Sequence, residues 1–219
     1  MHDPNPSPPD PRVGRLMAAI PDLGDDPAAD DPAQAGRARA AVALVLRTGD
    51  ELEVLLIRRA EAHGDPWSGH MALPGGRWAP EDDTLLRTAV RETLEETGVR
   101  LDGGTTVLGR LDPLIPATRR LPPISIFPFV FAVPGGTEAG AASHEVDETL
   151  WTPLSTFLDP NAAGTVDIAL GDGVRSFPCF RVEERVVWGL TYRILQDFLG
   201  KLRSGYPEIL AAPPGVSAD

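Results

Sequence analysis

Three glutamates on one predicted helix are the residues best placed to do chemistry. Glu92, Glu95 and Glu96 stand at positions i, i+3 and i+4, so they share one helix face. Like charges at this spacing repel by a few tenths of a kcal/mol per pair. Such a face is either fully solvated or neutralised by a cation. Because oxygen ligands select hard cations, the pattern predicts a site for Mg²⁺ or Mn²⁺.

The flanking residues define the helix and suggest that it is held rigidly. Asp82, Asp83 or Thr84 can cap its start, and Gly98 suits its end. A glycine turn, Pro74-Gly75-Gly76, precedes it. An apolar stripe is expected to be buried and consists of Leu85, Leu86, Ala89, Val90 and Leu94. This attachment favours a metal site over a solvated acidic face.

The stretch from Gly76 to Val99 resembles the Nudix box, G-x5-E-x7-R-E-U-x-E-E-x-G-U, where U is a bulky aliphatic residue. The second half is represented by Arg91, Glu92, Glu95, Glu96, Gly98 and Val99, with Leu94 read as the bulky aliphatic residue. The first half departs from the pattern. Counted back from Arg91, the family glutamate falls on Asp83, and six residues instead of five separate Asp83 from Gly76. Glu81 and Asp82 remain alternatives for this position.

The resemblance implies an α/β fold, a Nudix-like α/β/α sandwich with a mixed β-sheet between helices. It also implies that Glu92 and Glu96 bind the metal and that Glu95 is a further ligand or assists the base. The carbonyl of Gly76 is another candidate ligand, because glycine lets the backbone approach a metal closely. Arg91 is expected to orient a carboxylate, with Asp83 as its expected partner.

A second set of motifs resembles the coenzyme A pyrophosphatase branch of this family. The first motif is Leu55 to Ala60 (LLIRRA), which is followed by Gly69. The second is Leu73 to Gly76 (LPGG), which six residues separate from an aspartate. The third is Trp188 to Thr191 (WGLT). Gly64 stands where that branch has a second arginine. Candidate substrate-binding residues are Arg59, Gly75, Trp67 and His70. Glu148 or Glu145 is a candidate base or extra metal ligand.

These observations predict a metal-dependent pyrophosphohydrolase that cleaves a nucleoside diphosphate derivative. Coenzyme A or a related dinucleotide is the favoured substrate. One alternative is a housecleaning hydrolase of oxidised nucleoside triphosphates. Another is a non-catalytic Nudix-like nucleotide sensor, although sensors typically lose box glutamates and this chain keeps all three.

Composition narrows the class of protein. The net charge of −12 argues against a nucleic-acid partner, which would favour a basic surface. The single cysteine, Cys179, excludes an internal disulfide and fits a reducing cytoplasm. The sequence has no apolar run of 18 residues, so no membrane partner is expected. The sequence leaves open whether the protein forms a homodimer.

The chain is expected to contain one folded domain between two tails. The ranges are a mostly disordered tail at 1–36, a Nudix domain at 37–204 and a frayed tail at 205–219. Within the first tail, a short docking helix could be formed by Val13, Leu16, Met17 and Ile20. Strands are expected at 40–46, 53–57, 124–133, 145–151 and 175–187, with Pro128 at an edge or bulge. Helices are expected at 153–158 and from Trp188 onward.

Overall fold

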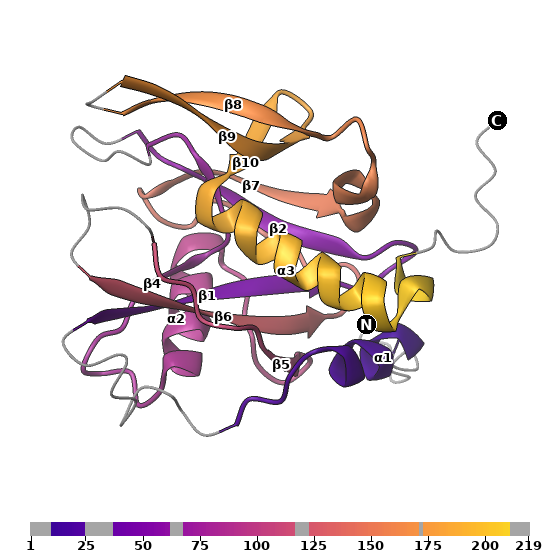
Figure 1. Ribbon diagram of the computed structural model, residues 1–219. Helices are drawn as coiled ribbons and strands as arrows, with labels where there is room; N and C mark the ends of the chain where they lie inside the picture. The colour runs from indigo at the N-terminus through magenta and orange to yellow at the C-terminus, as the bar shows by residue number, and fades with distance from the viewer. Residues whose placement is uncertain (1–9, 25–36, 62–67, 117–122, 171–172, 211–219) are drawn as a thin grey trace.

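A computed structural model describes residues 10–24, 37–61, 68–116, 123–170 and 173–210 (Figure 1). Its elements are α1 (Pro11–Ala19), β1 (Ala38–Arg47), β2 (Glu53–Arg59), β3 (Met71–Ala72), β4 (Gly75–Arg77), α2 (Leu85–Thr97), β5 (Thr106–Arg110), β6 (Ile124–Val133), β7 (Val146–Pro153), η2 (Leu154–Leu158), β8 (Ala163–Leu170), β9 (Gly173–Val182), β10 (Arg185–Trp188), α3 (Gly189–Gly205) and η3 (Pro207–Ile209). The strands predicted at 40–46, 53–57 and 124–133 are confirmed, as are the short helix and the C-terminal helix. No helix among these ranges is long and apolar enough to cross a membrane.

The main sheet is mixed and lies between two helices. Its strand order is β3-β2-β1-β6-β5, with β4 also paired to β1 and β7 to β2, and β1 runs parallel to β6. In Figure 1, α3 lies in front of this sheet and α2 behind it. Alternate side chains of β1 serve the two faces: Ala43 packs in the cluster that contains Leu85 of α2, and Leu44 in the cluster that contains Phe198 of α3. The predicted α/β/α sandwich is therefore confirmed.

Strands β1 and β2 diverge, and the glycine turn fills the space between them. They pair at Leu46 with Val54 and at Arg47 with Glu53. Farther along, β4 pairs with the start of β1, while β3 pairs with the end of β2. The backbone N–H of Ala43 also donates to the Pro74 carbonyl over 2.8 Å. The segment from β3 to β4 is thus fixed on both sides, which holds the glycine turn beside α2.

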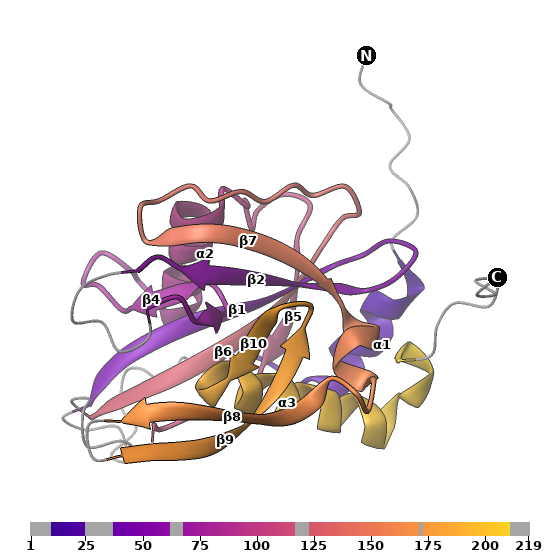
Figure 2. The same cartoon turned by 90° about the horizontal axis from the view of Figure 1, so that it is seen from above.

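A second sheet follows the main one and has the order β10-β9-β8. The sequence predicted a single strand over 175–187, but the chain turns at Glu183 and Glu184 to form two antiparallel strands. Glu183 has a φ of 53°, and a turn made by two glutamates lacks the glycine or asparagine that normally signals a hairpin. In Figure 2 this sheet lies on the same side of the main sheet as α3, opposite α2.

The N-terminal segment contains an element of the core. Helix α1 confirms the hypothesis of a short docking helix, and Leu16 and Ile20 are buried in the α3-side core, whereas Met17 is 49% exposed. The Pro21 carbonyl accepts from Arg110 N over 3.0 Å. A Cβ on Gly109, whose φ is 145°, would come within 3.0 Å of that carbonyl. Residues 1–9 and 25–36 lie outside the described residues.

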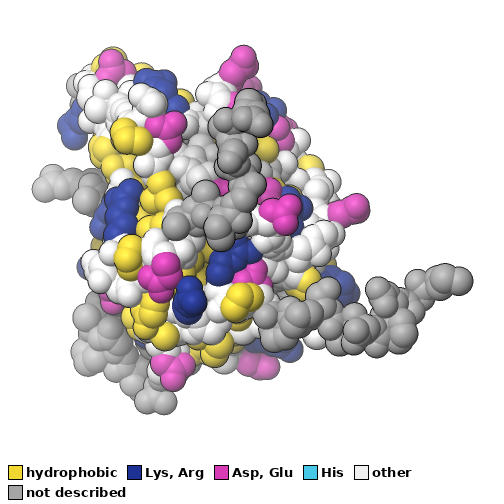
Figure 3. Space-filling model, turned by 90° about the vertical axis from the view of Figure 1, so that its right-hand side faces the viewer, with side chains coloured by type: hydrophobic (Ala, Val, Ile, Leu, Met, Phe, Trp, Pro, Cys, Tyr) yellow, Lys and Arg dark blue, Asp and Glu magenta, His cyan; other side chains and the backbone are white. Residues whose placement is uncertain are grey.

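The C-terminal end of the described chain is packed as well. Ile209 of η3 is buried in the same core as α1, so the expected frayed tail begins with a packed turn. Figure 3 shows this side of the molecule, where acidic and basic side chains are interspersed with small apolar groups.

The prediction that Pro128 marks an edge is wrong. Strand β6 lies between β1 and β5, and Pro128 stands opposite Val42 of β1. The irregularity lies on the neighbouring strand β5, between Val107 and Gly109, and the Pro128 carbonyl accepts from Leu111 N over 2.9 Å beyond it. Strand β5 ends at Arg110, so Pro128 lies beside the segment that follows this strand.

Candidate active site

Helix α2 has the predicted ends, and its buried face differs from the predicted stripe at Leu94. Among the three candidate caps, Thr84 is the one used, and its hydroxyl accepts from Arg87 N over 3.1 Å. Gly98 ends the helix with a φ of 69°, as predicted. The prediction that Leu94 is buried is wrong, because its side chain is 41% exposed. Thr93 is buried instead, and its hydroxyl donates to the Ala89 carbonyl over 2.7 Å.

The glycine turn packs directly onto two of the glutamates. The backbone N–H of Gly75 donates to Glu96 Oε2 over 2.8 Å. A Cβ on Gly76 would come within 3.0 Å of the Glu92 carboxylate, and a Cβ on Gly75 would come equally close to the backbone of Ala41. Real Cβ atoms essentially never make such contacts. Glycine is therefore required at position 75, and any side chain at position 76 would displace the Glu92 carboxylate.

Glu96 is buried, and Glu92 is partly buried. Burial raises the pKa of Glu96 to about 7, against the lowering effect of the Gly75 hydrogen bond. The negative charges of Glu92 and Glu145 raise it further, while Arg59 lowers it. Burial is also the main cause that raises the pKa of Glu92. Two neighbouring carboxylates that resist ionisation form a pair that a divalent cation would stabilise.

The donor set fits Mg²⁺ or Mn²⁺, although the carboxylates do not converge on one point. Among the described residues, no three acidic, histidine or cysteine side chains already form a metal-binding group. Arg91 pairs with two of these glutamates, since its Nη1 lies 2.9 Å from Glu92 Oε1 and 3.1 Å from Glu95 Oε2. Glu95 is 55% exposed, so it is free to rotate. Metal binding would require Glu92 to turn from Arg91 toward Glu96.

The prediction that Arg91 holds Asp83 is wrong. Arg91 Nε and Nη2 donate to the two oxygens of Asp82 over 3.0 and 2.9 Å. Asp82 is buried and also accepts from the Thr88 hydroxyl over 2.9 Å. The hydrogen bond from Arg91 is the main reason that the pKa of Asp82 lies below its ordinary value. Asp83 is exposed.

This pairing locates the extra residue in the box. Asp82 follows Gly76 after five residues, which is the family spacing, and eight residues then separate it from Arg91 instead of seven. The insertion therefore lies after the acidic residue. Counting forward from Gly76, in place of backward from Arg91, would have identified Asp82.

The candidate substrate residues are brought together only in part. The Gly75 N–H is committed to Glu96, and the Arg59 side chain is close enough to Glu96 to affect its pKa. The backbone N–H of Arg59 donates to the His70 carbonyl over 3.1 Å, which places His70 beside the end of β2. Trp67 lies outside the described residues.

Glu145 and Glu148 lie in different surroundings. The loop before β7 covers the end of α2, where Ala142 N donates to the Glu96 carbonyl over 3.0 Å, and it brings the charge of Glu145 close enough to raise the pKa values of Glu92 and Glu96. The side chains of Glu148 and Trp151 lie on opposite faces of β7, and Glu148 accepts hydrogen bonds from Arg185. These bonds are the main cause that lowers its pKa. Glu145 is the better placed of the two to act at the glutamate pair.

Glu148 belongs to the other face of the main sheet. It stands opposite Arg58, and Leu150, two residues along, packs into the α3-side core, whereas Trp151 packs into the α2-side core. Since side chains two residues apart in a strand share a face, the Glu148 side chain lies on the α3 side. The strand expected at 145–151 included both glutamates, whereas β7 begins at Val146 and leaves Glu145 in the loop before it.

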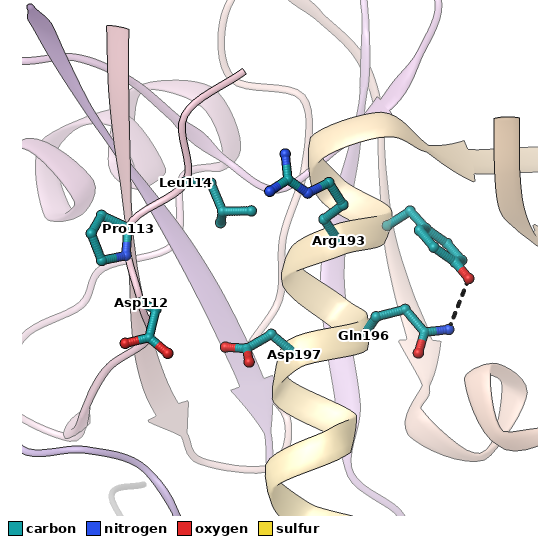
Figure 4. Close-up of a pocket in the computed structure, with 7 residues that line it drawn as sticks. Asp112, Pro113, Leu114, Arg193, Gln196 and Asp197 are labelled. Carbon is teal, nitrogen blue, oxygen red and sulfur yellow. Dashed lines mark hydrogen bonds between the residues drawn. The ribbon is translucent and has the colours of Figure 1, made fainter. Parts of the chain in front are cut away.

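A cavity of about 340 Å³ opens on the α3 side (Figure 4). It is lined by Asp112, Pro113, Leu114, Tyr192, Arg193, Gln196 and Asp197. Lys201 pairs with both aspartates, at 3.3 Å from Asp112 and 3.5 Å from Asp197. None of the predicted site residues lines this cavity.

Comparison with known proteins agrees with this geometry. The family model of the NUDIX domain matches residues 36–168. The chain is 31% identical over 159 residues to an uncharacterised Nudix hydrolase, NudL, of Yersinia pestis, which covers 72% of this chain and 76% of that protein. It is 36% identical over 118 residues to an uncharacterised protein, C14C4.10c, of Schizosaccharomyces pombe, covering 52% of this chain but only 36% of that longer protein.

A solved structure has the same fold. A MutT/nudix family protein from Enterococcus faecalis superposes with a TM-score of 0.51 at 17% identity, covering 80% of this chain and 65% of that one. The class defined by the sandwich, the glycine turn and the glutamate helix is that of a diphosphate hydrolase. The chain belongs to the Nudix family and is a Nudix-type enzyme.

Proposed function

We propose that the protein is a divalent-metal-dependent pyrophosphohydrolase that cleaves the diphosphate linkage of a nucleoside diphosphate derivative. The observation that carries this proposal is the pair Glu92, which is partly buried, and Glu96, which is buried one turn away, both packed against Gly75 and Gly76. Buried carboxylates without a bound cation cost stability, so their retention points to a ligand of opposite charge.

Glu92 and Glu96 would hold the metal, with Glu95 and the Gly76 carbonyl as candidate further ligands. A bound Mg²⁺ or Mn²⁺ would neutralise phosphate charge and favour ionisation of water. The protein's own groups supply the remaining functions. Arg91, fixed by Asp82, sets the position of the glutamate face, and Arg59 brings positive charge beside Glu96, where diphosphate oxygens would lie.

Glu145 is the proposed general base. Its side chain is exposed, and its charge reaches both buried glutamates. In the reaction, a water oxygen forms a bond to one phosphorus, the bridging P–O bond breaks, Glu145 accepts the water proton, and the second phosphate leaves with the bridging oxygen. Glu148 is a poorer candidate, because it is engaged by Arg185 on the opposite face of the sheet.

Coenzyme A or a related dinucleotide is the proposed substrate, on the resemblance of the LLIRRA, LPGG and WGLT segments to the coenzyme A pyrophosphatase branch. Incubation with coenzyme A and Mg²⁺ should yield 3′,5′-ADP and 4′-phosphopantetheine. If other diphosphates are cleaved and coenzyme A is not, the substrate assignment fails while the reaction class stands.

A substrate panel separates the two alternatives from this proposal. Preference for oxidised nucleoside triphosphates, with release of pyrophosphate, would favour a housecleaning hydrolase. Nucleotide binding without turnover, and with equal affinity in wild type and Glu96→Gln, would favour a sensor.

A further inference from the structure

The second sheet lies largely beyond the matched Nudix domain, yet it is fixed to the main sheet. The family match ends at residue 168, within β8, so β9 and β10 are additions to it. Arg185 of β10 donates to both oxygens of Glu148 on β7, and the Nε to Oε2 distance is 3.1 Å. Arg58 of β2 lies 3.7 Å from the same carboxylate. Three strands are thereby joined at one point.

Three aromatic rings lie together where β10 contacts β3, and we call them the aromatic cluster: His70, Phe177 and Trp188. The His70 and Trp188 rings meet edge to face at 4.9 Å between centroids, and the Phe177 and Trp188 rings are tilted at 5.2 Å. All three residues are only partly buried. Val166, which pairs with Phe177 across the hairpin, is also partly buried and extends the apolar surface.

The aromatic cluster lies close to the proposed site along the backbone. The His70 carbonyl accepts from Arg59 N over 3.1 Å, and five residues farther along the chain Gly75 N donates to Glu96 Oε2 over 2.8 Å. His70 directly precedes β3, and the chain then runs through Pro74 to the glycine turn. Strand β10 contacts β3. A substrate with its diphosphate beside Glu96 therefore has an aromatic surface within reach of its organic groups.

We infer that the aromatic cluster binds the nucleobase of the substrate. The inference rests on the proposed function and specifies it further, since it assigns the organic end of the substrate to His70 and to two residues beyond the matched domain, Phe177 and Trp188. Partly exposed indole, phenyl and imidazole rings offer flat apolar faces on which a base can stack. An aliphatic arm is the competing occupant, and the experiments below distinguish it.

Intrinsic fluorescence tests the inference without requiring turnover. In the full-length protein, AMP should quench tryptophan emission in wild type and in Trp151→Phe, whose indole lies in the α2-side core against Arg47. The quench should disappear in Trp188→Phe. A quench that survives in Trp188→Phe, or one produced by 4′-phosphopantetheine but not by AMP, would overturn the inference.

Kinetics give a second readout. Phe177→Leu should raise KM about tenfold for a diadenosine diphosphate and leave kcat within about threefold. The same variant should leave both constants unchanged for 5-phosphoribosyl 1-diphosphate, which has no base. Equal effects on the two substrates would mean that Phe177 acts only on the fold and would contradict the inference.

Two controls distinguish a failure of this inference from a failure of the proposed function. Phe157→Leu removes a buried ring that packs edge to face on Phe180, so it should lower Tm without altering discrimination between the two substrates. If no diphosphate is hydrolysed, the proposed function fails, and the AMP quench still decides whether the aromatic cluster binds a base. If hydrolysis is normal but insensitive to Phe177 and Trp188, the inference alone fails.

Discussion

The two faces of the main sheet each hold acidic side chains, but they neutralise them differently. On the α3 side, Glu148 has a protein cation, Arg185, which lowers its pKa. On the α2 side, burial raises the pKa values of Glu92 and Glu96, and Arg91 compensates only partly because it is committed first to Asp82. A carboxylate paired with arginine holds elements together, whereas buried carboxylates left short of positive charge are suited to an external cation.

The largest expected effect comes from removing a charge on the α2 side. Glu92→Gln or Glu96→Gln should lower kcat by about 10³-fold or more, because the loss of a metal ligand removes several kcal/mol of charge stabilisation. Glu95→Gln, at an exposed position, should cost less. Steady-state kinetics at saturating Mg²⁺ would measure this. If Glu148→Gln were as damaging as Glu96→Gln, the contrast between the faces would be lost.

The next effect tests the fit of the glycine turn. Gly76→Ala should lower kcat by about 10²-fold, since the added Cβ would come within 3.0 Å of the Glu92 carboxylate and force it to move. Gly103→Ala is the matched control, because a Cβ there would meet nothing within 4 Å. Activity of Gly76→Ala equal to that of the control would show that the Glu92 position is unimportant.

The partner of Arg91 can be tested by two neighbouring substitutions. Asp82→Asn should cost about 2 kcal/mol in the free energy of unfolding, discounted for the partial exposure of Arg91, and should reduce activity. Asp83→Asn, at an exposed site, should leave both nearly unchanged. Urea titration at pH 7 compares them. A larger loss of unfolding free energy in Asp83→Asn than in Asp82→Asn would show that Asp83 is the partner of Arg91.

The same pair predicts a pH dependence of stability. Because the folded pKa of Asp82 lies below its ordinary value of 3.8, its stabilising effect is present at neutral pH. The effect should fade as the pH falls below about 4. The difference in unfolding free energy between wild type and Asp82→Asn should shrink in that range.

Glu96 predicts the opposite dependence in metal-free protein. Its pKa is raised from 4.5 to about 7, so the unfolded state gives up the proton first and stability falls as the pH rises between these values, by about 3 kcal/mol at most. In EDTA, the Tm of Glu96→Gln should therefore rise relative to the Tm of wild type between pH 5 and pH 8. A constant difference in Tm over that range would mean that Glu96 is not desolvated.

The smallest effect should come from the α3 side. Glu148→Gln keeps the shape of the side chain but weakens its pairing with Arg185 and Arg58, which are partly exposed, so a loss of about 1 kcal/mol is expected. Turnover of a base-free diphosphate should stay within about twofold of wild type. A loss above tenfold would indicate that Glu148 acts directly in the chemistry.

The sequence predicted the parts of the fold and site that depend on short-range patterns. The glutamate spacing, the helix ended by Gly98 and the apolar runs of β1, β2 and β6 are visible in consecutive residues. The burial of Thr93 in place of Leu94 was missed, although the box pattern puts its aliphatic position directly after Glu92; a threonine that bonds to its own helix occupies that position in the core. The choice of Asp82 depended on where a loop absorbs one extra residue, which only its packing reveals.

The second sheet and the docking of α1 depend on contacts between distant segments. Strand β8 is partly exposed along its length and has no strong hydrophobic pattern. The turn at Glu183 carries no glycine, and the burial of Leu16 requires α3 and β5 to be in place. Opposite roles for Glu145 and Glu148 followed from a strand boundary and could not be read from their order.

Calorimetric titration of the metal-free protein with Mg²⁺ and Mn²⁺ tests the central claim most directly. Wild type should bind with measurable heat, and the Glu92→Gln/Glu96→Gln double variant should not, while Glu148→Gln should bind like wild type. Equal heats for wild type and the double variant, or no heat for wild type even with a nucleotide present, would contradict the assignment of the α2-side glutamates as a cation site.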